Sequence, residues 1–85
     1  MVTWQDYLDG ARETYAKIAP KIAQIGLKWD PQIIAQLQVD MRQAWSNLKE
    51  YERELIALKA PDNVKKTIAL WIKIVDDAYK TVVKL

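Results

Sequence analysis

Apolar residues recur along the whole chain at alternating spacings of four and three, and this pattern constrains the fold more than any other feature. Residues with that spacing lie on one stripe of an α-helix. The pattern forms three runs and therefore predicts an all-α protein with helices at about residues 4–25, 31–59 and 63–84. The stripes consist of Trp4, Leu8, Ala11, Tyr15, Ile18, Ile22 and Ile25; of Ile34, Leu37, Met41, Ala44, Leu48, Tyr51, Leu55 and Leu58; and of Val64, Ile68, Trp71, Val75, Ala78, Val82 and Leu85.

Residues at the start of each run support these boundaries. Thr3 together with Asp6 resembles a capping box. Asp30 supplies an N-cap acceptor and is followed by Pro31 at the first helical position. Asp62 is the expected N-cap of the third helix.

Residues between the runs favour helix termination. Gly26 suits the left-handed residue that closes the first helix, Leu27 can make the accompanying apolar contact, and Pro61 prevents the second helix from continuing. Within the first helix, Gly10 costs about 1 kcal/mol and Pro20 about 3 kcal/mol relative to Ala. The heptad phase passes unchanged through both residues, which fall at water-facing positions. We therefore expect a continuous first helix bent at Pro20, with a break there as the alternative.

Both connections, at roughly residues 26–29 and 60–62, are short, which favours antiparallel neighbours. We expect one domain over residues 1–85, an antiparallel up-down-up three-helix bundle. The period of 3.5 residues implies left-handed, coiled-coil-like packing. Large residues beside small ones would give a dense core. The expected layers are Tyr15 with Ala44 and Ala78, Ala11 with Leu48 and Val75, and Leu8 with Tyr51 and Trp71.

Composition excludes several function classes. A chain of 85 residues with 51% apolar and 28% charged residues is expected to fold around one core. The net charge of +2 is too small to indicate nucleic acid as a partner. The absence of a targeting segment and of a long apolar run predicts a soluble protein without a membrane partner; it names no compartment.

Residues with catalytic chemistry are scarce. The chain has no Cys and no His, so it lacks a thiolate nucleophile, an ordinary general base and the usual zinc ligands. Glu50 and Glu54 lie four residues apart, but they are interpreted as part of a solvated face. Asp76 and Asp77 are expected to pair with Lys80 and with Lys73 on the outer face of the third helix. We expect no enzyme activity, no catalytic residue, no metal site and no cofactor.

An apolar contact surface is the remaining candidate for a function. The apolar arc of the third helix covers roughly 220° of the helical wheel, which exceeds what two neighbouring helices need. A groove between the second and third helices would bind a partner helix or a second copy. The alternative is that Trp45 and Ile72 widen the core. The candidate contact residues are Trp45, Ile56, Leu70, Ile72, Ile74, Tyr79 and Val83.

Two handednesses of the bundle remain open at this point. The second pairs Glu52 with Arg12 across a helix seam. The first brings together Trp45 with Ile72 and Tyr79, Glu52 with Lys65, and Asp40 with Lys21.

The regular heptads, the Asp30-Pro31 cap, the absence of Cys and His and the complementary layers resemble a computationally designed or redesigned helical bundle. The resemblance implies a thermostable scaffold without native activity. Gly10, Pro20, Val39 and Leu70 depart from idealised design. They suggest new sequence on a natural backbone, or an undesigned small protein of a virus or microbe. Two functions follow as hypotheses: a monomeric structural scaffold that requires no partner, or a protein-interaction module.

Overall fold

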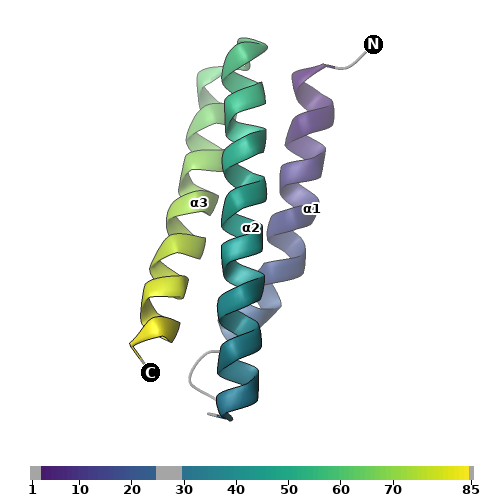
Figure 1. Cartoon of the computed structure of the whole chain (residues 1–85). Coiled ribbons are helices and arrows are strands. Elements are labelled where there is room, and N and C mark those ends of the chain that lie inside the picture. Colours follow the sequence, from purple (N-terminus) through teal and green to yellow (C-terminus); the bar gives the residue numbers. More distant parts are fainter. Residues whose placement is uncertain (1–2, 25–29, 85) are drawn as a thin grey trace.

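The computed structural model describes residues 3–24 and 30–84, which form three helices (Figure 1). Helix α1 spans Trp4–Ala23, α2 spans Pro31–Ala57 and α3 spans Asp62–Val83. Helices α1 and α3 run in one direction and α2 in the other, so the described chain is an all-α, up-down-up three-helix bundle. None of these helices is both long and apolar enough to cross a membrane.

Helix α2 is the centre of the arrangement. It packs along both α1 and α3, whereas α1 and α3 contact each other much less. Figure 1 shows α2 in front, with α1 and α3 on either side. The molecule is elongated, with dimensions of 44 × 20 × 16 Å.

The first two helices begin where the cap residues predict. The backbone N–H of Thr3 donates to Asp6 Oδ2 at 2.9 Å, which is the carboxylate half of a capping box. The backbone N–H of Gln32 donates to Asp30 Oδ1 at 2.9 Å, and Pro31 is the first residue of α2. Both starts follow from local chemistry alone.

The prediction that Asp62 caps α3 is wrong by one residue. Pro61 is the N-cap, and its carbonyl oxygen accepts from the backbone N–H of Val64 at 3.0 Å. Asp62 instead lies in the first turn, where a carboxylate is favoured by the helix dipole. Its side chain pairs with Lys65 at 3.3 Å.

Helix α1 continues through Pro20 to Ala23, so the alternative of a break at Pro20 is wrong. The predicted cap at Gly26 and Leu27 and the core position Ile25 lie outside the described residues.

Helix α2 ends two residues earlier than predicted, in a Schellman motif that lacks glycine. Lys59 has a φ of 57° and so occupies the left-handed region that favours glycine. The N–H of Ala60 donates to the carbonyl of Leu55 at 3.0 Å, and the N–H of Lys59 donates to that of Ile56 at 3.1 Å. Ala60 and Leu55 are both buried, which supplies the apolar contact typical of this motif.

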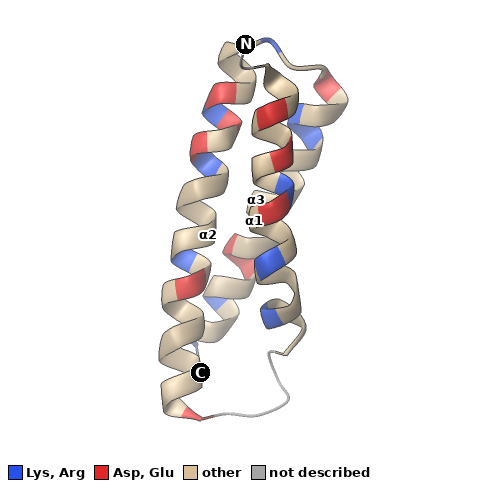
Figure 2. Ribbon diagram, turned by 90° about the vertical axis from the view of Figure 1, so that its right-hand side faces the viewer, with Lys and Arg blue, Asp and Glu red and all other residues tan. Residues whose placement is uncertain are grey.

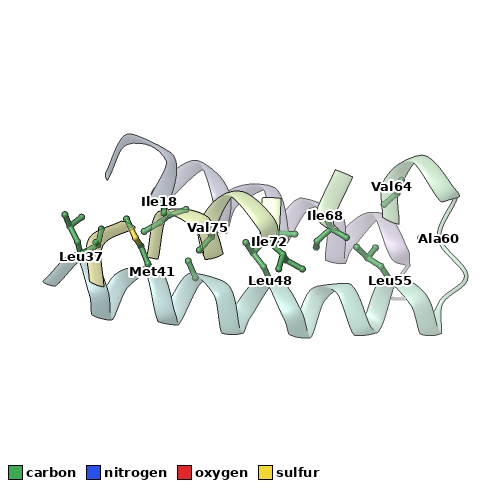
Figure 3. Packing of buried hydrophobic residues seen from close by; sticks show 14 residues of the cluster. Ile18, Leu37, Met41, Leu48, Leu55, Ala60, Val64, Ile68, Ile72 and Val75 are labelled. Atoms are coloured by element: carbon green, nitrogen blue, oxygen red, sulfur yellow. The ribbon is translucent and has the colours of Figure 1, made fainter. Parts of the chain in front are cut away.

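The core consists of apolar side chains along the predicted stripes (Figure 3). Among the described residues no polar or charged residue is buried. Two residues outside the predicted stripes, Ala60 and Ile72, are also buried, whereas Leu58 at the end of α2 is 39% exposed, contrary to prediction. Several predicted core residues are only partly buried against this cluster: Trp4, Leu8, Tyr15, Ile22, Ile34, Tyr51 and Trp71.

Aromatic rings connect the layers differently from the expected scheme. Tyr15 stacks on Trp71, with ring centroids 5.3 Å apart and an interplanar angle of 12°. Tyr51 instead meets Tyr7 at a centroid distance of 6.4 Å. The expected layers place Trp71 with Leu8 and omit its contact with Tyr15. Long side chains extend along the helix axis beyond their own layer, which allows this contact.

The heptad position of Gly10 predicts that this residue faces water, and that prediction is wrong. It is partly buried, and a β-carbon at this position would lie 2.8 Å from Cε1, Cζ and Oη of Tyr51. The glycine therefore leaves room for the Tyr51 ring between α1 and α2.

Candidate protein-contact site between α2 and α3

Two observations select the first of the two expected bundle arrangements. Lys21 Nζ lies 2.6 Å from Asp40 Oδ2, which joins α1 to α2. Trp45 of α2 and Tyr79 of α3 line the same pocket. The alternative arrangement, which pairs Glu52 with Arg12, is therefore wrong.

Neither expected pairing of Glu52 forms across a seam. Glu52 pairs with Lys49 at 3.5 Å on its own helix, and Arg12 pairs with Asp9 at 3.7 Å. Lys65 is engaged by Asp62. A charged side chain reaches a partner one turn away on its own helix without holding two helices in a fixed register. This explains why the pairs within one helix form.

The Lys21–Asp40 pair shifts the pKa of the Asp40 carboxyl group. The hydrogen bond from Lys21 lowers the pKa of Asp40 below its usual value, and a second hydrogen bond from Gln36 Nε2 to Asp40 Oδ1, at 2.9 Å, acts in the same direction. The pair is partly exposed, so we assign it a structural role rather than a chemical one.

The pocket between α2 and α3 has a volume of about 570 Å³. Helix α2 contributes Arg42, Trp45 and Ser46, and α3 contributes Asp76 and Tyr79. Spacings of three and four place each set on one side of its helix. Trp45 keeps 39% of its surface exposed, while Tyr79 is partly buried against the core. The pocket is therefore a surface depression with aromatic side chains in its walls.

Charged side chains surround these rings. Lys49 Nζ lies 5.7 Å from the centroid of the Trp45 ring, within the range of a cation–π contact. Asp76 pairs with Lys80 at 3.0 Å, as predicted, and the hydrogen bond between them raises the pKa of Lys80. Among the described residues, Arg42 forms no ion pair.

The expected pair of Asp77 with Lys73 does not form within the described chain. The backbone carbonyl of Asp77 accepts a hydrogen bond from Thr81 Oγ1 at 3.0 Å.

The structure brings together only part of the predicted contact surface. Ile72 is 8% exposed and lies among the core residues in Figure 3, so its prediction as a surface contact is wrong. The alternative, in which this residue widens the core, is correct for Ile72. It is not correct for Trp45, which remains at the surface.

Leu70 and Ile74 lie on another side of α3. Tyr79 lies nine positions after Leu70, and at about 100° per position their side chains leave the helix in opposite directions. Ile74 is likewise about 140° from Tyr79 around the helix. The seven candidates therefore do not form one surface, because Leu70 is exposed on a side of α3 away from Tyr79.

Val83 and Ile56 lie on the same sides of their helices as the pocket residues. Val83 follows Tyr79 by one turn, and Ile56 follows Trp45 by three turns, about 16 Å along α2. Both are exposed. Neither lines the pocket, so Trp45 and Tyr79 are the predicted contact residues that the structure unites.

Three pocket residues were not identified from the sequence: Arg42, Ser46 and Asp76. Arg42 lies three residues before Trp45, Ser46 follows Trp45 directly, and Asp76 lies three residues before Tyr79. The spacing of Arg42 before Trp45 was a usable signal, since residues at i and i+3 share a helix face.

Glu50 and Glu54 lie at a second depression, between α1 and α2. Its volume is about 400 Å³, and Tyr7, Tyr51 and Arg53 are among its lining residues. Both carboxylates belong to exposed residues, as the solvated-face interpretation predicts. Over residues 3–24 and 30–84 no group of three or more Asp and Glu side chains gathers as a possible metal site.

All three helices carry both acidic and basic residues (Figure 2). No protein-family model, no curated protein and no solved structure matches this chain. The fold defines the class of this chain as an all-α three-helix bundle.

Proposed function

We propose that this chain is a non-catalytic helical scaffold that binds another protein through the pocket between α2 and α3. The observation that carries the proposal is the position of Trp45. Its indole remains 39% exposed at a pocket that it shares with Tyr79 and Arg42. Trp, Tyr and Arg are the residues most enriched among those that dominate the energy of protein interfaces.

The bundle supports such a role through its rigidity. The pocket residues project from regular helices that also carry buried core residues, including Leu48 on α2 and Val75 on α3. A contact surface held by packed helices loses little conformational entropy on binding. The walls of the pocket are therefore suited to contact without rearrangement.

Binding of an apolar fluorescent dye tests whether this surface is available. We expect the dye to bind the native protein, and Trp45→Ala to remove most of that binding. Leu70→Ala is the matched control, because Leu70 is an exposed apolar residue on α3 outside the pocket. Absence of dye binding, or equal loss in both variants, would contradict the proposal.

A scaffold that folds stably and has no partner is the second candidate. It is supported by the exclusively apolar set of buried residues and by the caps at both ends of α2. A designed origin remains a prediction from the sequence pattern. A monomer that binds neither dye nor peptide at the pocket would favour this second candidate.

A further inference from the structure

Arg42 is the cation at the pocket that forms no ion pair within the described chain; the carboxylate of Asp76, which lines the same pocket, pairs with Lys80. The other two cations near the pocket are engaged: Lys80 pairs with Asp76 at 3.0 Å and Lys49 with Glu52 at 3.5 Å. Arg42 has no counterpart of this kind among residues 3–24 and 30–84. It is an exposed residue, so its guanidinium is accessible to an external group.

The neighbours of Arg42 on α2 do not supply a carboxylate. The residues one turn before and after it are Gln38, Val39, Trp45 and Ser46. An i, i+3 or i, i+4 ion pair, which the other cations of the pocket use, is therefore not open to Arg42. A guanidinium binds a carboxylate through two parallel hydrogen bonds, and this geometry makes a carboxylate its best-matched ligand.

The position of Arg42 relative to the aromatic rings sets the spacing that a ligand needs. Arg42 and Trp45 are three residues apart, a rise of about 4.5 Å along α2. Two side chains at i and i+4 of a partner helix are separated by a similar rise of about 6 Å. A helix laid along the α2/α3 seam can thus present one apolar and one acidic side chain to the two positions.

We infer that the occupant of the pocket is an amphipathic helix of another protein, with an apolar anchor between Trp45 and Tyr79 and a carboxylate one turn away bound to Arg42. This inference rests on the proposed function and adds the chemistry of the partner. The complementary charge, rather than the apolar contact, selects the partner.

The test uses three synthetic amphipathic helical peptides that differ at one position. Each carries Leu as the anchor and Glu, Gln or Lys four residues later. Each is titrated into the isotope-labelled full chain while the backbone and indole N–H resonances are followed by nuclear magnetic resonance. We expect shifts centred on Trp45, Ser46 and Tyr79, with the Glu peptide bound about two- to five-fold more tightly than the Gln peptide, the range that an exposed ion pair supplies.

Two substitutions on α2 assign the preference to one residue. Arg42→Gln is expected to abolish the difference between the Glu and Gln peptides. Arg53→Gln removes the same charge from the same helix about 16 Å away and is expected to leave the difference intact. Trp45→Ala should weaken binding of all three peptides, because it removes the anchor contact.

The outcomes separate this inference from the function on which it rests. Equal binding of the Glu and Gln peptides at Trp45, or tighter binding of the Lys peptide, overturns the inference and leaves the docking site standing. Failure of every peptide to shift Trp45 overturns both. Concentration-dependent dimerisation in sedimentation equilibrium that is lost in Trp45→Ala would identify a second copy as the occupant, and would overturn the inference that the partner is foreign.

Discussion

The ring of Tyr51 fills the space that a β-carbon on Gly10 would occupy. Its Cε1, Cζ and Oη atoms all lie 2.8 Å from that position, closer than a β-carbon tolerates. Gly10 therefore fixes how closely α1 approaches the Tyr51 side of α2, although glycine disfavours a helix interior by about 1 kcal/mol.

Replacing Gly10 with Ala is not expected to stabilise the bundle, despite the higher helix propensity of Ala. Overpacking costs about 1–3 kcal/mol, which equals or exceeds the propensity gain of about 1 kcal/mol. In a Tyr51→Ala background the clash is gone, and the same change should raise the free energy of unfolding by about 1 kcal/mol. Urea denaturation of the four proteins measures both effects. Equal stabilisation in the two backgrounds would show that the ring does not restrict Gly10.

The Lys21–Asp40 pair predicts a dependence of stability on pH. The pKa of Asp40 is lowered in the folded chain, chiefly by the hydrogen bond from Lys21. Its contribution is therefore fully present above the unfolded-state pKa of about 3.9 and is lost as the pH falls through the folded-state value. Because both side chains are partly exposed, the contribution is expected to be about 1 kcal/mol or less.

Asp40→Asn isolates this contribution. Stability measured between neutral pH and acid should decline less steeply in the variant than in the parent. Asp9→Asn is the matched control, since Asp9 lies in a more exposed and longer pair with Arg12. An identical decline in the parent and in Asp40→Asn would contradict the assigned role.

Lys59→Gly is expected to stabilise the protein by about 1 kcal/mol, because glycine adopts the left-handed conformation without the steric cost borne by other residues. Thermal unfolding checks this directly. Lys66→Gly, an exposed position inside α3, should have the opposite sign and a similar size. Destabilisation by Lys59→Gly would indicate that the Schellman ending of α2 does not require its positive φ.

The Tyr15–Trp71 stack links α1 to α3, the pair of helices with the fewest mutual contacts. Tyr15→Leu keeps an apolar side chain but removes the stacked ring. We expect it to lower the free energy of unfolding by about 0.5–1.5 kcal/mol. The near-ultraviolet circular dichroism band of the tryptophans, to which Trp71 contributes, should weaken at the same time. Loss of stability without any change in that band would argue against the stack.

The three helices and the core stripe could be predicted from the sequence, because burial of one side of a helix makes apolar residues recur every three or four positions, with polar residues between them. Helix ends were less so. Asp62 and Pro61 both have properties of a helix start, and only the backbone conformation decides between them. The left-handed ending at Lys59 carried no sequence signal, since it lacks the glycine that usually marks it.

The candidate site was only partly predictable for a related reason. The apolar arc of α3 is wider than one interface, so the sequence leaves open the rotation of this helix about its axis. The structure turns Ile72 into the core, leaves Trp71 partly exposed and directs Leu70 away from Tyr79. Which residues of α3 border Trp45 depends on that same rotation, and hence Asp76 emerged only from the packed helices, whereas the position of Arg42 one turn before Trp45 follows from the sequence of α2.

The central claim is that Trp45 serves contact rather than folding, and its substitution tests this most directly. Denaturant unfolding of Trp45→Ala should show a loss of about 1 kcal/mol or less, the size typical of surface positions. Ile72→Ala, one side chain inward at the same seam, should lose about 2–5 kcal/mol. A loss of about 3–5 kcal/mol for Trp45→Ala, as for a buried tryptophan, would contradict the claim and place Trp45 in the core.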